Sequence, residues 1–169
     1  MSDLRSAPVP PPGEQDHVTR TSSSARLIIE YADFECPFCA ALHAELAHSP
    51  VRLVFRHFPV RSSHPRAWPV ACAAEAAALQ GRFWEMHDLL FADQARLEDP
   101  HLWTHAEQLG LNLERFDRDR RGDPVRRRVQ SDFRGGVRAG VVTTPTVFMD
   151  GEQFSGRGAV SALHRLLEA

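Results

Sequence analysis

Short apolar runs at two places in this chain of 169 residues predict β-strands, and amphipathic patterns predict helices between them. The runs at 26–32 and 51–58 are rich in β-branched and aromatic residues, and the segment 36–47 between them has a helical pattern. This order of strand, helix and strand is typical of a βαβ unit with parallel strands. Near the other end of the chain, residues 146–154 predict a hairpin that turns at Asp150-Gly151.

The middle of the chain, from about 63 to 140, is predicted to be entirely helical. Asp-Pro pairs at 99 and 123 are typical of helix starts, and Gly81 and Gly110 are typical of helix ends. We expect Gly135-Gly136 to soften the last helix of this block, and an amphipathic helix over 158–167 to end the chain. The predicted middle helices span 69–79, 82–93, 99–110, 112–122 and 123–140.

Residues 1–24 differ in composition from the rest and predict a flexible N-terminal tail. The segment 7–13 is proline-rich, and 21–24 is polar. A proline-rich ligand for a partner domain is the less favoured alternative. The predicted organisation is thus a tail over 1–24, an α/β domain made of 25–62 and 141–169, and a helical insertion over 63–140.

The charge balance indicates no nucleic-acid or membrane partner. The net charge is −2, and all 20 basic residues are arginine. Arginines are dense over 115–134, but aspartates are interleaved with them, which favours a solvated helix face. No apolar run is long enough to span a membrane, and residues 1–25 do not resemble a signal peptide. We therefore expect a cytoplasmic protein, or an exported one if the true start lies upstream.

Cys36 and Cys39 are the residues with the most evident chemistry. They lie where the first strand meets the first helix, and residues three apart on a helix share a face, close enough for a disulfide. The positive end of a helix stabilises a thiolate at its first position. The pattern predicts a reversible dithiol in which Cys36 attacks and Cys39 resolves. A zinc site is disfavoured because it needs four ligands, and Cys72 is the one other cysteine.

Other polar residues have more than one interpretation. Glu30 lies inside an apolar strand, where a buried carboxylate is either protonated or functional; an edge position that reaches solvent is the alternative. Arg56 and His57 are able to face the cysteines, but a packed or solvent-exposed role for His57 is favoured. His87 is expected to be structural rather than a metal ligand, and Cys72 is expected to be buried and inert. No metal-binding residue is predicted.

Four segments together resemble the DsbA-like thioredoxin-fold oxidoreductases, and most closely the small bacterial branch also found fused to sodium/proton antiporters. The segments occur in the right order and place the resemblance over about residues 16 to 168. The resemblance implies an α/β thioredoxin fold with a helical insertion. The four segments are Glu30–Cys39, Phe55-Arg56-His57-Phe58-Pro59, Gly81–Asp88 and Thr143-Thr144-Pro145-Thr146.

The resemblance also implies roles for single residues. A cis-proline loop at Thr144-Pro145 faces the cysteines and, with Pro37 and Phe38, contacts the substrate. Glu30 relays a proton to or from Cys39. An exposed edge of backbone at Thr144 is expected to pair with an extended substrate peptide.

We therefore expect a thiol-disulfide oxidoreductase that exchanges electrons with protein or peptide disulfides and dithiols through a mixed disulfide on Cys36. No cofactor is expected, and glutathione or another redox partner is compatible with this chemistry. The alternatives are a glutathione-linked enzyme of the same fold and a zinc-binding interaction module. Because Pro37-Phe38 supplies no cation and Thr144 precedes the proline, we expect a reductase or isomerase rather than an oxidase.

Overall fold

A mixed sheet forms the centre of the computed structural model, which describes residues 6–19, 21–22 and 24–167. Among these residues the strand order is β1-β3-β2-β4-β5, with β2 in the middle of the sheet. Strands β2 and β3 are parallel, and the other neighbours are antiparallel. The strands are β1 (His17–Val18), β2 (Arg26–Ala32), β3 (Val51–His57), β4 (Thr146–Met149) and β5 (Glu152–Ser155).

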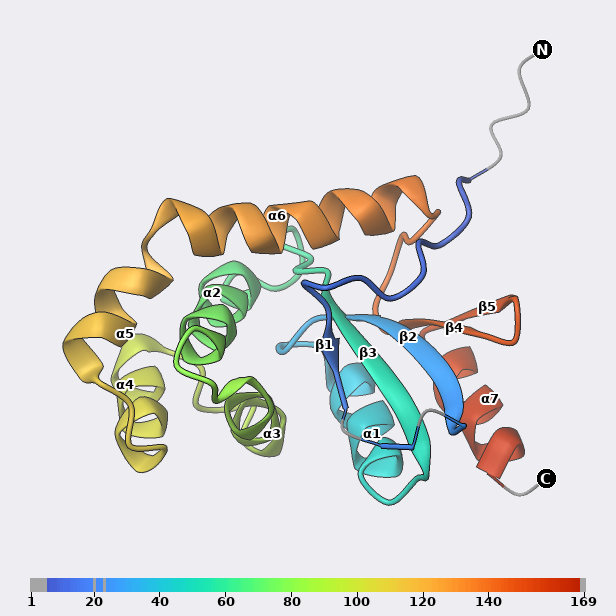
Figure 1. The fold of residues 1–169 in the computed structure, drawn as a ribbon, viewed down its shortest axis with the longest axis horizontal. Coiled ribbons are helices and arrows are strands. Elements are labelled where there is room, and N and C mark those ends of the chain that lie inside the picture. Colours follow the sequence, from blue (N-terminus) through green and yellow to red (C-terminus); the bar gives the residue numbers. More distant parts are fainter. Residues whose placement is uncertain (1–5, 20, 23, 168–169) are drawn as a thin grey trace, which may run out of the picture.

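Helices cover both faces of the sheet and form a block beside it (Figure 1). Helices α2 to α5 make up the block, and α6 runs from it across the end of the sheet. The chain is an α/β protein, and the helices between β3 and β4 interrupt the order of strands as the sequence predicted. The helices are α1 (Pro37–Leu46), α2 (Ala67–Ala78), α3 (Phe83–Ala92), α4 (Asp99–Gln108), α5 (Leu113–Arg120), α6 (Asp123–Arg138) and α7 (Arg157–Leu167).

Alternating side chains on β2 and β3 build two separate cores. Ile28 and Leu53 point to the face covered by α1 and α7, where they pack with Leu42 and Leu163. Ile29, Tyr31 and Val54 point to the other face, where they pack with Phe58 and Val141. A third cluster joins Phe55 and the cysteine pair to helices α2 to α5. The cysteines thus lie where the sheet, α1 and the helical block meet.

Helix α6, in which Gly135 and Gly136 were expected to soften the structure, continues through both glycines. A Cβ atom at Gly136 would lie 2.7 Å from Phe58 and 2.9 Å from Tyr31. Glycine therefore serves close packing of the helix against the sheet at this point, rather than a break in the helix.

The described part of the segment 1–24, for which a flexible tail was predicted, makes contacts with the rest of the protein. Residues 17–18 form β1, which pairs antiparallel with β3 at the edge of the sheet. The amide of Ala7 donates to the carbonyl of Arg138, at 2.8 Å. The side chain of Arg56 donates to the carbonyls of Pro10 and Pro11 and to the carboxylate of Asp16. The proline-rich segment is therefore bound to the body of the protein by a buried arginine.

Most turns follow the sequence signals that predicted them. Asp150 and Gly151 both have positive φ, 50° and 83°, which suits a tight two-residue hairpin. The side chain of Asn112 caps α5 by accepting from the amide of Arg115. Asp99 is already inside α4, and Glu98 is the N-cap instead.

In the described part of the chain, none of the helices has the length and apolar character needed to cross a membrane.

Candidate active site

Cys36 lies at the N-cap of α1, in an extended conformation, and Pro37 is the first helical residue. A tight turn brings the chain from β2 into this helix, with the Cys36 amide donating to the carbonyl of Asp33 at 3.0 Å. The Cys36 carbonyl then accepts from the amides of Cys39 and Ala40, which begins the helix. The thiol of Cys36 is therefore next to the free amides of the first helical turn, which favour a negative charge.

The two cysteines have opposite acidities. A hydrogen bond from the Cys39 thiol lowers the pKa of Cys36 to about 6; burial acts against this change, and the amides of Cys39 and Phe38 support it. Burial raises the pKa of Cys39 well above its usual range, and its hydrogen bond to Cys36 raises it further. Cys39 has no exposed surface, whereas Cys36 is 4% exposed. At neutral pH the pair thus holds one thiolate, on the outer cysteine.

The loop before β4 lies against Cys36. The Thr144-Pro145 peptide bond is cis, and in its protonated form the Cys36 thiol donates to the carbonyl of Thr144 at 3.3 Å. Thr144 is buried, and Thr146 is fixed by hydrogen bonds from its hydroxyl to the Thr143 carbonyl and with Ser155. Two segments 108 residues apart in sequence are therefore in direct contact at the reactive sulfur.

Glu30 is buried in the central strand, so the alternative of an edge position open to solvent is wrong. Burial raises the pKa of Glu30 to about 8, and the charge on Cys36 adds to this rise. Its Oε1 atom has no hydrogen-bond partner among the described residues. The charge of Glu30 is in turn one of the causes that raise the pKa of Cys39. A neutral carboxylic acid therefore lies within electrostatic reach of both sulfurs.

Apolar side chains are exposed on both segments that form the site. Phe38, on the first turn of α1, is 37% exposed, and Val142, in the loop before the cis proline, is 82% exposed. The guanidinium of Arg157 lies over the Phe38 ring at 5.3 Å from its centroid. Exposed apolar side chains beside a reactive group are typical of a surface that binds another chain.

Gln94 is a site residue that sequence reasoning missed. Its side-chain amide donates to the carbonyls of Phe34 and Cys36, at 2.8 and 2.9 Å, and so holds the turn that presents the thiol. Gln94 follows α3 in a loop about 60 residues downstream. No local pattern marks it, because its role depends on the packing of the helical block against α1.

Asp33 organises the same turn from inside. Its carboxylate accepts from the amides of Glu35 and Val60 and from the ring of His64. Glu35, the residue before Cys36 in the chain, is paired with Arg66 at 2.7 Å. The positive charge of Arg66 offsets that carboxylate close to the reactive cysteine.

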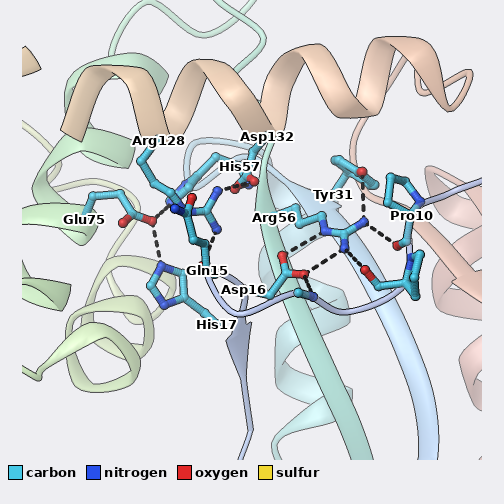
Figure 2. A network of polar contacts seen from close by, with 12 residues as sticks. Pro10, Gln15, Asp16, His17, Tyr31, Arg56, His57, Glu75, Arg128 and Asp132 are labelled. Carbon is cyan, nitrogen blue, oxygen red and sulfur yellow. Dashed lines mark hydrogen bonds and ion pairs between the residues drawn. The ribbon is translucent and has the colours of Figure 1, made fainter. Parts of the chain in front are cut away.

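The remaining predicted residues lie away from the sulfurs' immediate contacts. Arg56 lies opposite Tyr31 in the pairing of β2 and β3, so it points to the other face of the sheet from Glu30. Its side chain bonds to Asp16 and Tyr31 (Figure 2). His57 is buried and bonds to Glu75. Cys72 is buried in α2, and burial raises the pKa of its thiol to about 11. Its burial and weak acidity match the inert thiol expected from the sequence.

Comparison with known sequences places the chain among thioredoxin-like proteins. The family model described as Thioredoxin matches residues 14–169. The Na(+)/H(+) antiporter NhaA 1 of Mycolicibacterium gilvum is 40% identical over 164 residues, which cover 92% of this chain and 27% of the antiporter. The chain thus spans about a quarter of the length of the curated relatives it matches.

Solved structures show the same fold at low sequence identity. A thioredoxin-like oxidoreductase from Silicibacter pomeroyi has a TM-score of 0.76 and 23% identity, over 93% of this chain and 95% of that one. The thiol-disulfide exchange protein α-DsbA2 from Wolbachia pipientis has a TM-score of 0.78 and 14% identity, over 92% and 87%. These similarities support the predicted thioredoxin fold with inserted helices.

Proposed function

The chain belongs to the thioredoxin family, and on that premise we propose that it is a thiol-disulfide oxidoreductase acting on protein or peptide thiols and disulfides. The observation that carries the proposal is the asymmetry of the cysteine pair. The pKa of Cys36 is lowered to about 6, and that of Cys39 is raised. A nucleophilic outer thiolate and a protonated inner thiol are what stepwise disulfide exchange requires.

In the reducing direction, the Cys36 thiolate attacks one sulfur of a substrate disulfide. A Cys36–substrate disulfide forms, the substrate S–S bond breaks, and the other substrate sulfur leaves as a thiolate. Cys39 then loses its proton and attacks the Cys36 sulfur, which releases the second substrate thiolate. The chain ends with a Cys36–Cys39 disulfide, and the substrate has gained two electrons.

Glu30 is proposed to take the proton from Cys39 in the second step. In the mixed disulfide Cys36 carries no charge, so one of the two causes that raise the pKa of Glu30 is absent. A larger fraction of Glu30 is then ionised and able to accept a proton at the moment when Cys39 must lose one. The buried Oε1 atom of this carboxyl has no competing hydrogen-bond partner among the described residues.

The substrate is proposed to lie across the two segments that contact Cys36. The backbone of Thr144 would pair with an extended peptide, and Pro145 would pack beside the reacting sulfurs. Pro37 and the exposed ring of Phe38 would contact apolar side chains of the substrate. This arrangement requires a flexible or unfolded segment around the substrate cysteine.

We also propose that the chain acts as a reductase or isomerase. The pKa of Cys36, about 6, is less depressed than the value near 3.5 that is typical of the strongest oxidants. A less stabilised thiolate gives a more reducing pair, which would lie below the strong-oxidant potential of about −120 mV. Equilibration with glutathione buffers measures this potential, and a value near −120 mV would reverse the direction.

The order of the two cysteines is tested by trapping. Cys39→Ser should accumulate a covalent complex with a peptide that contains one disulfide, because the second attack is absent. Cys36→Ser should form none, and Cys72→Ser should turn over insulin like the wild type. Mass spectrometry of the complex identifies the linked cysteine. If the wild-type protein were found with the peptide linked to Cys39 instead of Cys36, the assignment would be overturned.

The role of Glu30 is tested in the same reaction. Glu30→Gln should slow the second step at pH 7 and leave formation of the mixed disulfide nearly unchanged, because Gln cannot accept the Cys39 proton. Loss of general base catalysis typically slows a step by about 10²–10⁴-fold. Rapid-quench measurement separates the two steps. Equal slowing of both steps, or of neither, would remove the relay role.

A further inference from the structure

Three side chains that the proposed reaction does not use converge at the edge of the sheet (Figure 2). His17 comes from β1, His57 from the end of β3 and Glu75 from α2. The Nε2 atoms of the two histidines lie 2.7 and 2.6 Å from the same oxygen, Oε1 of Glu75. All three atoms lie within 4.8 Å of one another. Two imidazole nitrogens and one carboxylate oxygen therefore point to a common place.

Aromatic packing holds the two rings in these positions. His17 stacks on Phe83, with ring centroids 3.4 Å apart and planes at 5°. His57 packs edge-on against Phe55 and Phe83. His57 and Glu75 are buried, and the His17 side chain is 16% exposed. Packing thus holds the donor atoms close to one another before anything binds.

We propose that His17, His57 and Glu75 form a binding site for a divalent metal ion of the zinc class. Two histidines and one carboxylate are a ligand set of zinc sites that keep an open position. Metal–ligand distances of about 2.0–2.2 Å at tetrahedral angles separate ligand atoms by about 3.3–3.5 Å. The histidine nitrogens need to move only about 0.7 Å away from the Glu75 oxygen to reach that spacing.

A cavity of about 590 Å³ gives access to the site, because His17 and Glu75 are among its lining residues. Arg127 and Arg128 also line this cavity. Arg128 is paired with Asp132, and the positive charge of Arg127 favours an anion, such as hydroxide or a carboxylate, as the fourth ligand. The ion would thus be bound by the protein on one side and open to a small anionic ligand on the other.

The second group of this kind is a less suitable site. His43, His87 and Asp88 also place three donor atoms within 4.8 Å. The side chain of Asp88 is 63% exposed, so its carboxylate is well solvated, although it is hydrogen-bonded to His87 at 2.9 Å. Asp88 and His87 are neighbours on α3, and they supply a matched control within the same chain.

The sequence predicted no metal site, because it assigned His17 to a flexible tail 40 residues before His57. With β1 paired to β3, the tail supplies the third ligand. A bound ion would join the N-terminal segment, the sheet and the helical block. This inference does not depend on the cysteine pair, and a zinc-binding role for the cysteines is a separate hypothesis.

The test is a titration of the full chain in its disulfide form, after treatment with a chelator, so that Cys36 and Cys39 cannot bind metal. Zn²⁺ in competition with a chromophoric chelator should show one ion per chain. Co²⁺ should give visible bands of a four-coordinate N/O site without sulfur-to-cobalt charge transfer. His17→Gln should weaken binding at least tenfold, while Asp88→Asn should leave it unchanged.

A stability measurement keeps the test independent of variant folding. Zn²⁺ should raise the unfolding temperature of the wild type and of Asp88→Asn, but not of His17→Gln, because only bound metal stabilises the folded state. His17→Gln should retain insulin reduction, which shows that it is folded. Absence of binding, equal binding by His17→Gln, or loss of binding in Asp88→Asn would each overturn the proposal. Failure of the redox proposal would leave the metal titrations unaffected, and a cooperative unfolding transition of His17→Gln without metal would then show that it is folded.

Discussion

Glu30 and Glu75 are both buried, and they have opposite acidities. Glu30 lies in the centre of the sheet, where burial raises its pKa to about 8, and its Oε1 atom has no partner in the described part of the chain. Burial acts in the same direction on Glu75, but hydrogen bonds from His17 and His57 outweigh it and lower the pKa of Glu75. Partners, rather than depth, therefore decide which carboxylate is charged.

The difference separates a structural acid from a reactive one. Glu75 is ionised at neutral pH and joins three elements of the fold. Glu30 is held close to the point of titration, beside a pair of sulfurs that exchange protons and electrons. A buried carboxyl whose Oε1 atom has no partner among the described residues is unfavourable for stability, and its electrostatic coupling to both cysteines supports the proton transfer that we propose.

The largest expected effect concerns stability at neutral and alkaline pH. The folded pKa of Glu30 is about 8 and the unfolded value is 4.5, so the folded state holds the extra proton between these values. Wild-type stability contributed by this group is present below pH 4.5 and is lost as pH rises through 8. Glu30→Gln does not titrate, so it should exceed the wild type by about 4–5 kcal/mol at pH 8, relative to their difference at pH 4.

Urea unfolding of both proteins from pH 4 to 9 measures this difference, and the titration of Cys36 cancels in the comparison. The difference in unfolding free energy between the two proteins should be smaller in the disulfide form, because Cys36 then carries no charge to raise the pKa of Glu30. If the gap between the two proteins were the same at pH 4 and pH 8, Glu30 would be ionised like Glu75, and the contrast between them would be lost.

Glu75→Gln should give a smaller effect with the opposite dependence on pH. The folded pKa of Glu75 lies below its unfolded value of 4.5, so its stabilisation is present above pH 4.5 and is lost as pH falls. Replacing two hydrogen bonds to a charged group by neutral ones should cost about 2–3 kcal/mol at pH 7. The same unfolding series, with a chelator present, should show wild type and variant converging toward pH 3. A loss that stays constant with pH would mean that packing, and not charge, is responsible.

Much of this contrast was predictable from residues near each other in the chain. The apolar run around Glu30 predicted its burial, and Cys36 and Cys39 defined the helix start that they occupy. The order of strands and of inserted helices also followed from local patterns and from the resemblance. These features depend on periodicity and on helix and turn signals, which are local properties.

The missed features depend on contacts between distant segments. His17–Val18 is an edge strand of two residues, too short to give an alternating pattern. Arg56, at the end of a strand, anchors prolines that are 45 and 46 residues before it in the chain. Gln94 reaches the active-site turn only through helix packing. No pattern within one segment specifies its tertiary partner. The sequence alone therefore indicated neither the bound N-terminal segment nor the hydrogen bonds from Gln94 to the active-site turn.

The smallest expected effect is in the reactivity of Cys36, and it follows from the same contrast. The thiolate of Cys36 raises the pKa of Glu30, so an ionised Glu30 must raise the pKa of Cys36 equally. Cys36 titrates near pH 6, where an acid of pKa about 8 is only about 1% ionised. Glu30→Gln should therefore leave the alkylation midpoint near pH 6.

Near pH 8 the wild type should show a further rise in the alkylation rate, because an ionised Glu30 makes the thiolate more basic and more nucleophilic. Glu30→Gln should lack this second rise. Iodoacetamide kinetics from pH 4 to 10 measure both features, with Glu75→Gln as the control that keeps them. A midpoint shifted by a full pH unit in Glu30→Gln would mean that Glu30 is already charged when Cys36 titrates.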